Sequence, residues 1–124
     1  MTTATTADLM GLGLPGPLAQ RLGLQFKTAA GVGTAQAGAT ALSAGTFNRV
    51  TTAGGATAFV LPSSPQIGDD LFVECTTSTT ALVFPSSGMS INAVSADASV
   101  NVAQNVARWF IYTAANRWVS ILAT

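Results

Sequence analysis

The chain has 124 residues but carries few charges: five basic and five acidic residues, no histidine, and a formal net charge of zero. A free soluble domain is usually about a quarter charged, and a net charge away from zero helps to keep it dispersed. We therefore predict that copies of the same chain, or a larger assembly, cover much of the surface. The length suits one domain with one modest core.

The same composition excludes several classes of protein. The basic residues are scattered singly, so the basic face that phosphate neutralisation requires is missing and no nucleic-acid partner is expected. No apolar run approaches about 18 residues, so no membrane partner is expected. The first residues also lack the basic start and the apolar stretch of a signal peptide. The single cysteine, Cys75, forms no intrachain disulfide and is expected to be a small buried hydrophobe.

Residues 1–23 are predicted to form an anchoring arm with short helical turns. Thr5 or Thr6 can cap a first helix, and Pro17 can open a second one after the Pro15-Gly16 break. So short a segment cannot bury its large apolar side chains alone, so they must dock on the body of the domain, on a neighbouring subunit or on a separate partner. The predicted anchoring residues are Leu9, Met10, Leu12, Leu14, Leu18 and Leu22.

Residues 24–44 are rich in alanine, glycine and threonine and are predicted to be a linker or an edge strand. Gln25 to Ala29 is the candidate strand, with Phe26 as its only large side chain. A helix is disfavoured there because each glycine costs up to about 1 kcal/mol relative to alanine.

Residues 45–124 are predicted to be the body, a series of short apolar runs separated by turn signals. A spacing of about 8–12 residues per strand and turn is typical of an all-β sandwich or barrel. No helical period intervenes, so parallel βαβ units are not expected. The predicted fold is a compact antiparallel β-sandwich or barrel of about eight strands, preceded by the short helical or extended arm. The predicted strands are 46–52, 57–61, 70–76, 80–84, 90–94, 99–103, 108–113 and 117–122.

Two of these runs resemble each other. Ala58 to Ser64 reads AFVLPSS and Ala81 to Ser87 reads ALVFPSS, each ending at a proline that cannot donate to a sheet ladder. The echo is either a duplicated hairpin or two strands that meet similar demands. Both runs are apolar on both faces, which predicts burial on both sides.

The last two runs predict a β-hairpin with a three-residue loop, in which Asn116 adopts the left-handed conformation. Trp109 and Ile111 fall on one face, and Phe110 and Tyr112 on the other. Large side chains on both faces must be covered twice, once by the core and once by a neighbouring copy or the arm. The predicted subunit-interface residues are Phe110, Tyr112 and Trp118.

The sequence offers no reactive constellation, so no catalytic residue, cofactor or metal is expected and the chain is not predicted to be an enzyme. Gly11 to Gly16 matches a dinucleotide-binding spacing but follows no strand. Asp69 and Asp70 suit a turn, and Glu74 is expected to pair with an arginine (Arg49, Arg108 or Arg117). No serine has a histidine base and no metal-ligand spacing occurs. Aromatic side chains form the best alternative site, a sugar-stacking platform of Trp109, Tyr112 and Trp118.

Several phrases of the sequence resemble small structural proteins of tailed bacteriophages. They are ADLMGLGLPGPLA from Ala7 to Ala19, VTTAGGAT from Val50 to Thr57, and the closing WVSIL from Trp118 to Leu122. Among such proteins, head decoration (cement) proteins and head-fibre bases are the most similar.

The resemblance implies a non-enzymatic virion protein, often a homotrimer, that is made in the bacterial cytoplasm and sits on the capsid exterior. It would bind the major capsid protein through the arm and stabilise neighbouring capsid subunits. The alternative is a receptor- or carbohydrate-binding module of a tail fibre or adhesin.

Overall fold

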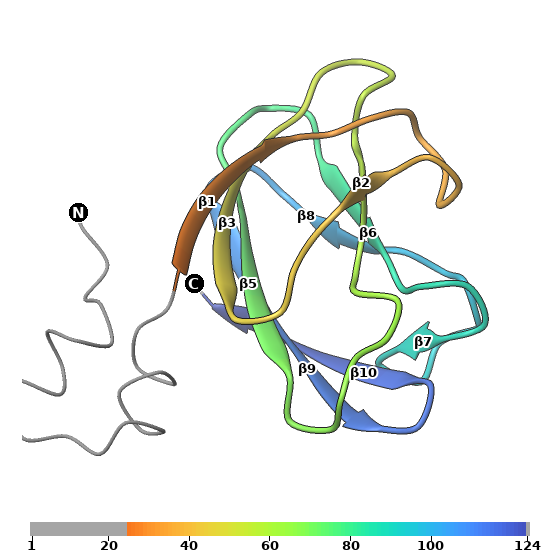
Figure 1. Cartoon of the computed structure of the whole chain (residues 1–124). Helices are drawn as coiled ribbons and strands as arrows, with labels where there is room; N and C mark the ends of the chain where they lie inside the picture. The colour runs from red at the N-terminus through yellow and green to blue at the C-terminus, as the bar shows by residue number, and fades with distance from the viewer. Residues whose placement is uncertain (1–24, 124) are drawn as a thin grey trace, which may run out of the picture.

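The structure, a computed structural model, describes residues 25–123, and these residues form strands and turns in two facing sheets. The strand labels are those of Figure 1. Sheet A has the spatial order β1 (Gln25–Ala30), β3 (Thr46–Thr51), β5 (Asp70–Cys75), β9 (Val106–Ala114), β10 (Arg117–Ala123) and β7 (Ser90–Ile91). Sheet B has the order β2 (Thr40–Ala41), β4 (Ala58–Val60), β6 (Ala81–Phe84) and β8 (Val100–Val102).

The chain winds as a β-solenoid, because successive strands alternate between the two sheets. In sheet A, β1, β3 and β5 are parallel neighbours, and in sheet B, β2, β4 and β6 are parallel neighbours. The pairs β1–β2, β3–β4 and β5–β6 are therefore three stacked coils. Figure 1 shows β1, β3 and β5 lying side by side. The prediction of an antiparallel sandwich or barrel was wrong. Parallel neighbours need a crossover connection, and here a strand in the opposite sheet provides it instead of a helix.

The C-terminal end of the solenoid is closed by antiparallel strands. β8 pairs with β6, β9 pairs with β5, and β10 pairs with β9 as a hairpin. Asn116, in the tight turn of this hairpin, has a φ of 60°. The predicted hairpin and the role of Asn116 are confirmed, with a connection one residue shorter than expected.

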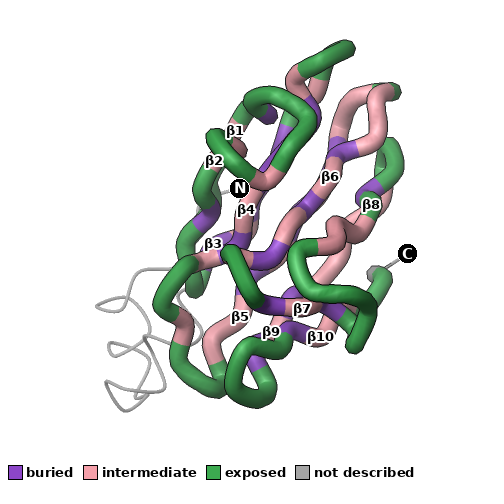
Figure 2. Tube along the Cα trace, turned by 90° about the vertical axis from the view of Figure 1, so that its right-hand side faces the viewer, coloured by how far each residue is buried: buried purple, intermediate pink, exposed green. Residues whose placement is uncertain are grey.

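The core lies between the two sheets, where alternate residues of each strand point inward. β5 shows the pattern most clearly, with Leu71, Val73 and Cys75 buried and the residues between them half-exposed. The expected burial of the Cys75 thiol is confirmed. Figure 2 shows the buried positions recurring along the strands, with exposed segments concentrated in the connections.

The two similar runs are adjacent strands of sheet B rather than a duplicated hairpin. β4 and β6 are parallel, with Phe59 opposite Val83, and both of these side chains are fully buried. Each run occupies the same place in its own coil. The two strands therefore have similar surroundings, which accounts for their similar sequences.

The first two coils approach each other closely at Gly31, which follows β1. Its N–H donates to Thr51 O at 3.0 Å. A Cβ atom built on Gly31 would lie 2.5 Å from the carbonyl oxygen of Ala56. This contact requires a residue without a side chain.

The expected helical arm of residues 1–23 and its six anchoring side chains lie outside the described residues. The segment predicted as a linker or edge strand contributes β1 and β2, which form the first coil. They are edge strands of sheet A and sheet B, respectively. Among residues 25–123 there is no helix long and apolar enough to cross a membrane.

Candidate functional site

An aromatic row crosses the outer face of sheet A at one level of four neighbouring strands. The strand register places Phe26 opposite Phe47, Phe47 opposite Phe72, and Phe72 opposite Trp109. Ile121, opposite Trp109 on β10, continues the row. These side chains share the outer face because residues directly opposite each other in a sheet point to the same side.

The four rings of the aromatic row stack on one another. Their centroids are 5.8, 5.7 and 5.6 Å apart in order, and adjacent ring planes differ by 11°, 24° and 5°. A hydrogen bond fixes the last ring, since Trp109 Nε1 donates to Asp70 Oδ2 at 2.9 Å. Stacked pairs of this kind add about 0.5–1.5 kcal/mol each beyond the area that they bury.

Both ends of the row are open to solvent. Phe26 is 47% exposed and Ile121 is 47% exposed, whereas the three residues between them are half-buried. Phe47 and Phe72 each stack against a ring on both sides, whereas Phe26 and Trp109 each stack against one ring. Within residues 25–123, no ring stacks on the side of Phe26 that faces away from Phe47.

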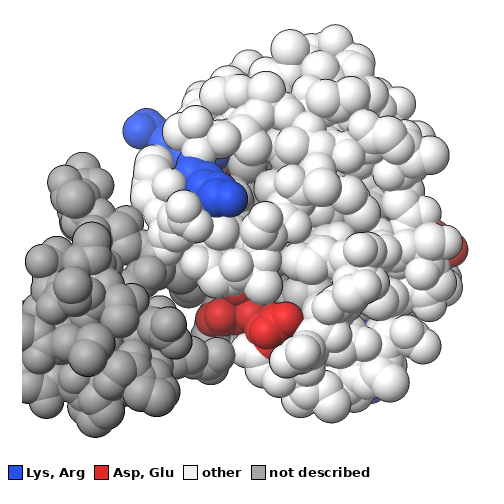
Figure 3. All heavy atoms as spheres, viewed as in Figure 1, with Lys and Arg blue, Asp and Glu red and all other residues white. Residues whose placement is uncertain are grey.

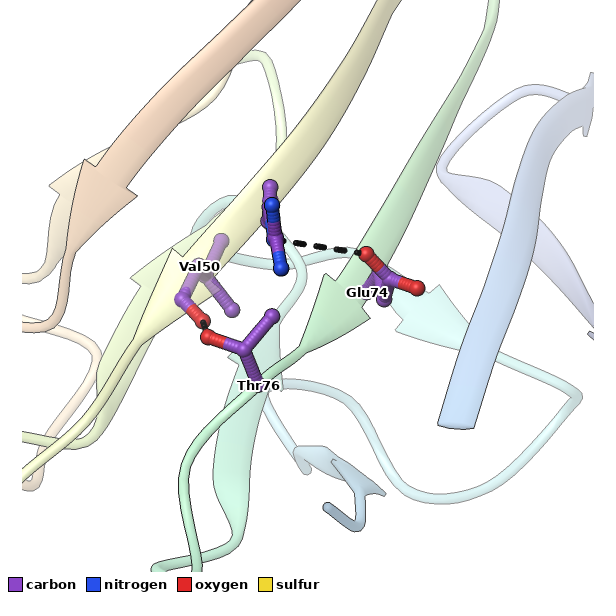
Figure 4. A network of polar contacts seen from close by, with 4 residues as sticks. Val50, Glu74 and Thr76 are labelled. Atoms are coloured by element: carbon purple, nitrogen blue, oxygen red, sulfur yellow. Dashed lines mark hydrogen bonds and ion pairs between the residues drawn. The ribbon is translucent and has the colours of Figure 1, made fainter. Parts of the chain in front are cut away.

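Beside the aromatic row, the same face of sheet A carries a polar row and an open hollow. Arg49 Nε lies 3.9 Å from Glu74 Oε1, which confirms one of the three predicted partners of Glu74. Thr76 Oγ1 donates to Val50 O at 3.1 Å (Figure 4). The hollow has a volume of about 480 Å³. It is lined by Thr28, Ala29, Ala30, Arg49, Thr51 and Thr76.

Apart from Arg49, Glu74 and Asp70, few charged side chains lie near this site, as the composition leads one to expect. Figure 3 shows a largely uncharged surface on the face that it presents, with a small basic group and a small acidic group apart from each other. Asp69, predicted to stabilise a turn, accepts a hydrogen bond from Gln66 N at 2.9 Å, so the prediction is confirmed. Asp70 instead anchors Trp109.

The three predicted subunit-interface residues lie in the hydrophobic core. Phe110 and Trp118 are fully buried and Tyr112 is nearly so. Tyr112 and Trp118 pack with ring centroids 5.3 Å apart, and Tyr112 Oη accepts a hydrogen bond from Asn116 N at 2.6 Å. Side chains in these positions cannot meet another subunit. The sugar-stacking platform is reduced to Trp109, because its other two members are in the core.

Sequence reasoning missed Phe26, Phe47 and Phe72 as members of a common site. The signal was their recurrence, because the register sets Phe26 opposite Phe47 and Phe47 opposite Phe72, with one phenylalanine at the same position of β1, β3 and β5. Recurrence at the length of one coil is typical of solenoid repeats. The alternation of apolar and polar residues that identifies single strands does not reveal this longer recurrence.

The two edges of sheet A differ. No described strand pairs with the outer side of β1. At the other edge the short strand β7 pairs with Arg117 and Trp118 of β10, and Asn92, which follows β7, shields the next part of β10. Asn92 Oδ1 accepts a hydrogen bond from Ser120 N at 2.7 Å, and Asn92 N donates to Trp118 O at 2.9 Å. Asn92 has a φ of 56°, a conformation that asparagine tolerates. The middle of β10 is thereby closed to a further strand.

One carboxyl group in the connecting loops has a shifted pKa. The side chain of Gln36 and the backbone N–H of Gly88 lower the pKa of Asp97 by donating hydrogen bonds of 3.0 and 2.7 Å to Oδ1. Gln36 Nε2 also donates to Pro85 O at 2.6 Å. The group joins three loops and is fully exposed. Its contacts are those of a structural turn.

The described residues contain no group of histidine, cysteine, aspartate or glutamate side chains arranged to hold a metal ion. The strongest chemical feature of residues 25–123 is instead a surface, formed by the aromatic row, the Arg49–Glu74 pair and the open edge of β1. Such an arrangement can bind by burial of apolar area and by backbone pairing.

Comparisons with known proteins give no family. No family model matches the chain, and no curated protein matches it. Among solved structures, one described as "Structure of a chaperone-substrate complex" is similar, with 16% sequence identity and a TM-score of 0.47. The match covers 81% of this chain and 17% of that chain.

Proposed function

We propose that the chain is a non-enzymatic structural subunit of a tailed-phage virion, a decoration protein that binds the outside of the capsid as a homotrimer. Its role would be to link neighbouring major capsid subunits. A ligand that binds only the assembled shell stabilises that shell by its binding free energy at each site.

The observation that carries the proposal is the aromatic row on the outer face of sheet A. Large apolar side chains follow one another across five strands without a covering element among the described residues. Contiguous exposed apolar surface marks interaction sites, and aromatic residues are enriched in protein interfaces. The sparse charge of the chain and its resemblance to phage structural proteins support the same assignment.

A matched pair of isoleucine variants tests the proposal. Ile121 lies at the end of the row, whereas Ile67 is 72% exposed outside the strands, in the connection before β5. We expect Ile121→Ser to weaken binding to shells that lack the chain by about tenfold, as expected for about 1.4 kcal/mol. We expect Ile67→Ser to bind like the unmodified chain. Co-sedimentation with purified shells measures both.

Two further measurements accompany this test. Attachment through a mainly apolar face, on which Arg49 and Glu74 are paired, should change little between low and high salt, because screening acts on charges. Light scattering gives the oligomeric state. A chain that is monomeric and never sediments with shells contradicts the proposal.

A second candidate is a carbohydrate-binding module, favoured by the hollow next to the aromatic row. Arg49 and threonine hydroxyls line the hollow, and the ring face of Phe26 on the side away from Phe47 is the kind of surface on which a sugar stacks. A glycan array followed by Arg49→Ala distinguishes the two functions. Glycan binding that this substitution abolishes favours the module over the capsid subunit.

A further inference from the structure

The hollow on the outer face of sheet A lies over three parallel strands, next to an ion pair. The register places Thr28 of β1 opposite Arg49 of β3, and Arg49 opposite Glu74 of β5. One row further along, Ala30 lies opposite Thr51. The volume of about 480 Å³ falls within the range of small-molecule sites, about 300–1,000 Å³. The hollow is therefore large enough for a small ligand that Arg49 and Glu74 can reach.

Arg49 and Glu74 meet only loosely. Arg49 Nε lies 3.9 Å from Glu74 Oε1, which is longer than the 2.7–3.2 Å typical of an N–H···O hydrogen bond, as a rough range. The two side chains are 59% and 38% exposed. Exposed pairs of this kind contribute little to stability. The guanidinium donors and the carboxylate acceptors thus keep their hydrogen-bonding capacity for a ligand.

Threonine hydroxyls supply the remaining polar groups of the hollow. Thr28 and Thr51 belong to its lining, as does Thr76. Thr76 Oγ1 donates its proton to Val50 O at 3.1 Å (Figure 4), so toward a ligand it can only accept. A site of hydroxyls with one positive and one negative group both donates and accepts hydrogen bonds. The hydroxyl groups of a neutral sugar match it, because they also do both.

The two charges narrow the choice of ligand further. Glu74 repels an anion that approaches Arg49, and Arg49 repels a cation that approaches Glu74. The gap between the two groups suits a pair of adjacent hydroxyls. One hydroxyl oxygen accepts a hydrogen bond from the guanidinium, and the neighbouring hydroxyl donates to the carboxylate.

We propose that the hollow binds a neutral sugar ring whose vicinal hydroxyls are shared between Arg49 and Glu74. The inference rests on the carbohydrate-binding candidate function and deepens it in two respects. It identifies the ligand as an uncharged sugar, and it makes Glu74 a second contact residue beside Arg49. The threonine hydroxyls of the lining contact the rest of the ring.

NMR titration of the full chain with three neutral probes tests the proposal. The probes are methyl α-mannoside, methyl β-galactoside and methyl β-glucoside. At least one should shift the amide signals of Thr28, Thr51 and Thr76 in a saturable manner. The dissociation constant should be in the millimolar range, because an open hollow buries little of its ligand. Methyl β-glucuronide, which carries a carboxylate, should bind no more tightly than the neutral probes.

Three variants identify the contacts, and all of them replace exposed or half-exposed side chains. Glu74→Gln should weaken binding of the neutral probe about tenfold, because a charge-assisted hydrogen bond becomes a neutral one. Arg49→Gln should weaken it by at least about as much. Arg117→Gln changes an exposed arginine at the start of β10 and is the matched control, so its affinity should equal that of the unmodified chain.

Each result bears on the proposal. Saturable shifts at the hollow that Glu74→Gln and Arg49→Gln weaken and Arg117→Gln preserves support it. Absence of shifts with all three neutral probes overturns it, as do shifts confined to another surface, tighter binding of the glucuronide, or unchanged affinity in Glu74→Gln. A positive glycan array without shifts at the hollow removes this site but retains the carbohydrate-binding function. Shell binding is measured separately by co-sedimentation.

Discussion

Trp109 Nε1 donates a hydrogen bond to Asp70 Oδ2 at 2.9 Å, and this bond ties the antiparallel end of sheet A to its parallel part. It holds the indole ring within 5° of the plane of Phe72. The solenoid coils and the closing hairpin are thus joined by the charge-assisted hydrogen bond of Trp109 to Asp70 and by the stacking of Trp109 on Phe72.

The first prediction follows from this bond. Asp70→Ala should lower the free energy of unfolding by about 1.5–3 kcal/mol, because hydrogen bonds to charged groups contribute that much. Asp70→Asn keeps an acceptor oxygen and should cost less. Urea unfolding measures both, and near-ultraviolet circular dichroism reports the order of the Trp109 ring. Equal stability of the two variants would argue that the bond is unimportant.

The second prediction concerns position within the aromatic row. Phe47 has a ring on each side and Phe26 has one neighbour. Phe47→Ala should therefore lose two stacked pairs, about 1–3 kcal/mol, and Phe26→Ala one pair, about 0.5–1.5 kcal/mol, apart from the loss of buried area. Chemical denaturation of the two variants gives the comparison. A larger loss at Phe26 is the contrary result.

The third prediction concerns the close approach of the first two coils. Gly31→Ala would push a methyl group to 2.5 Å from Ala56 O, a backbone atom that cannot rotate away. We expect a loss of about 1–3 kcal/mol, typical of overpacking. Gly54→Ala meets no atom within 4 Å and is the matched control, expected to be neutral or to stabilise by up to about 1 kcal/mol. Thermal unfolding of both variants tests the pair.

The fourth prediction concerns pH. Hydrogen bonds from Gln36 and Gly88 lower the pKa of Asp97 in the folded chain. Its stabilising contribution is therefore complete above the ordinary aspartate pKa of about 3.9 and is lost as the pH falls through the lower folded value. Asp97→Asn should be less stable than the unmodified chain at neutral pH, and the gap should shrink in acid. Urea unfolding across this range measures the gap, and a constant gap contradicts the assignment.

The positions of the strands could be predicted from the sequence, but their partners could not. The predicted run 70–76 corresponds to β5 (Asp70–Cys75), and 46–52 corresponds to β3 (Thr46–Thr51). Alternation and turn residues define a strand locally. They are the same for parallel and antiparallel neighbours, so they left open that β3 lies beside β5 in parallel.

The alternation of residues in the hairpin also could not show which of its two faces is exposed. The hairpin alternation correctly placed Trp109 and Phe110 on opposite faces, but both faces carry large side chains. Only the coil arrangement decides that Phe110 enters the core and that Trp109 joins a row begun by Phe26, at the far end of the described sequence. Long-range register, which no window of a few residues contains, created the candidate site.

The asymmetry of the two edges of sheet A limits how copies of this molecule can be joined. Endless head-to-tail growth requires two complementary ends. At the second edge β7 offers only Ser90 and Ile91, and Asn92 holds the backbone of β10 just beyond them. A two-residue edge strand followed by a side-chain cap makes this flank a poor site for sheet extension. Head-to-tail growth into a fibre through sheet A is therefore disfavoured.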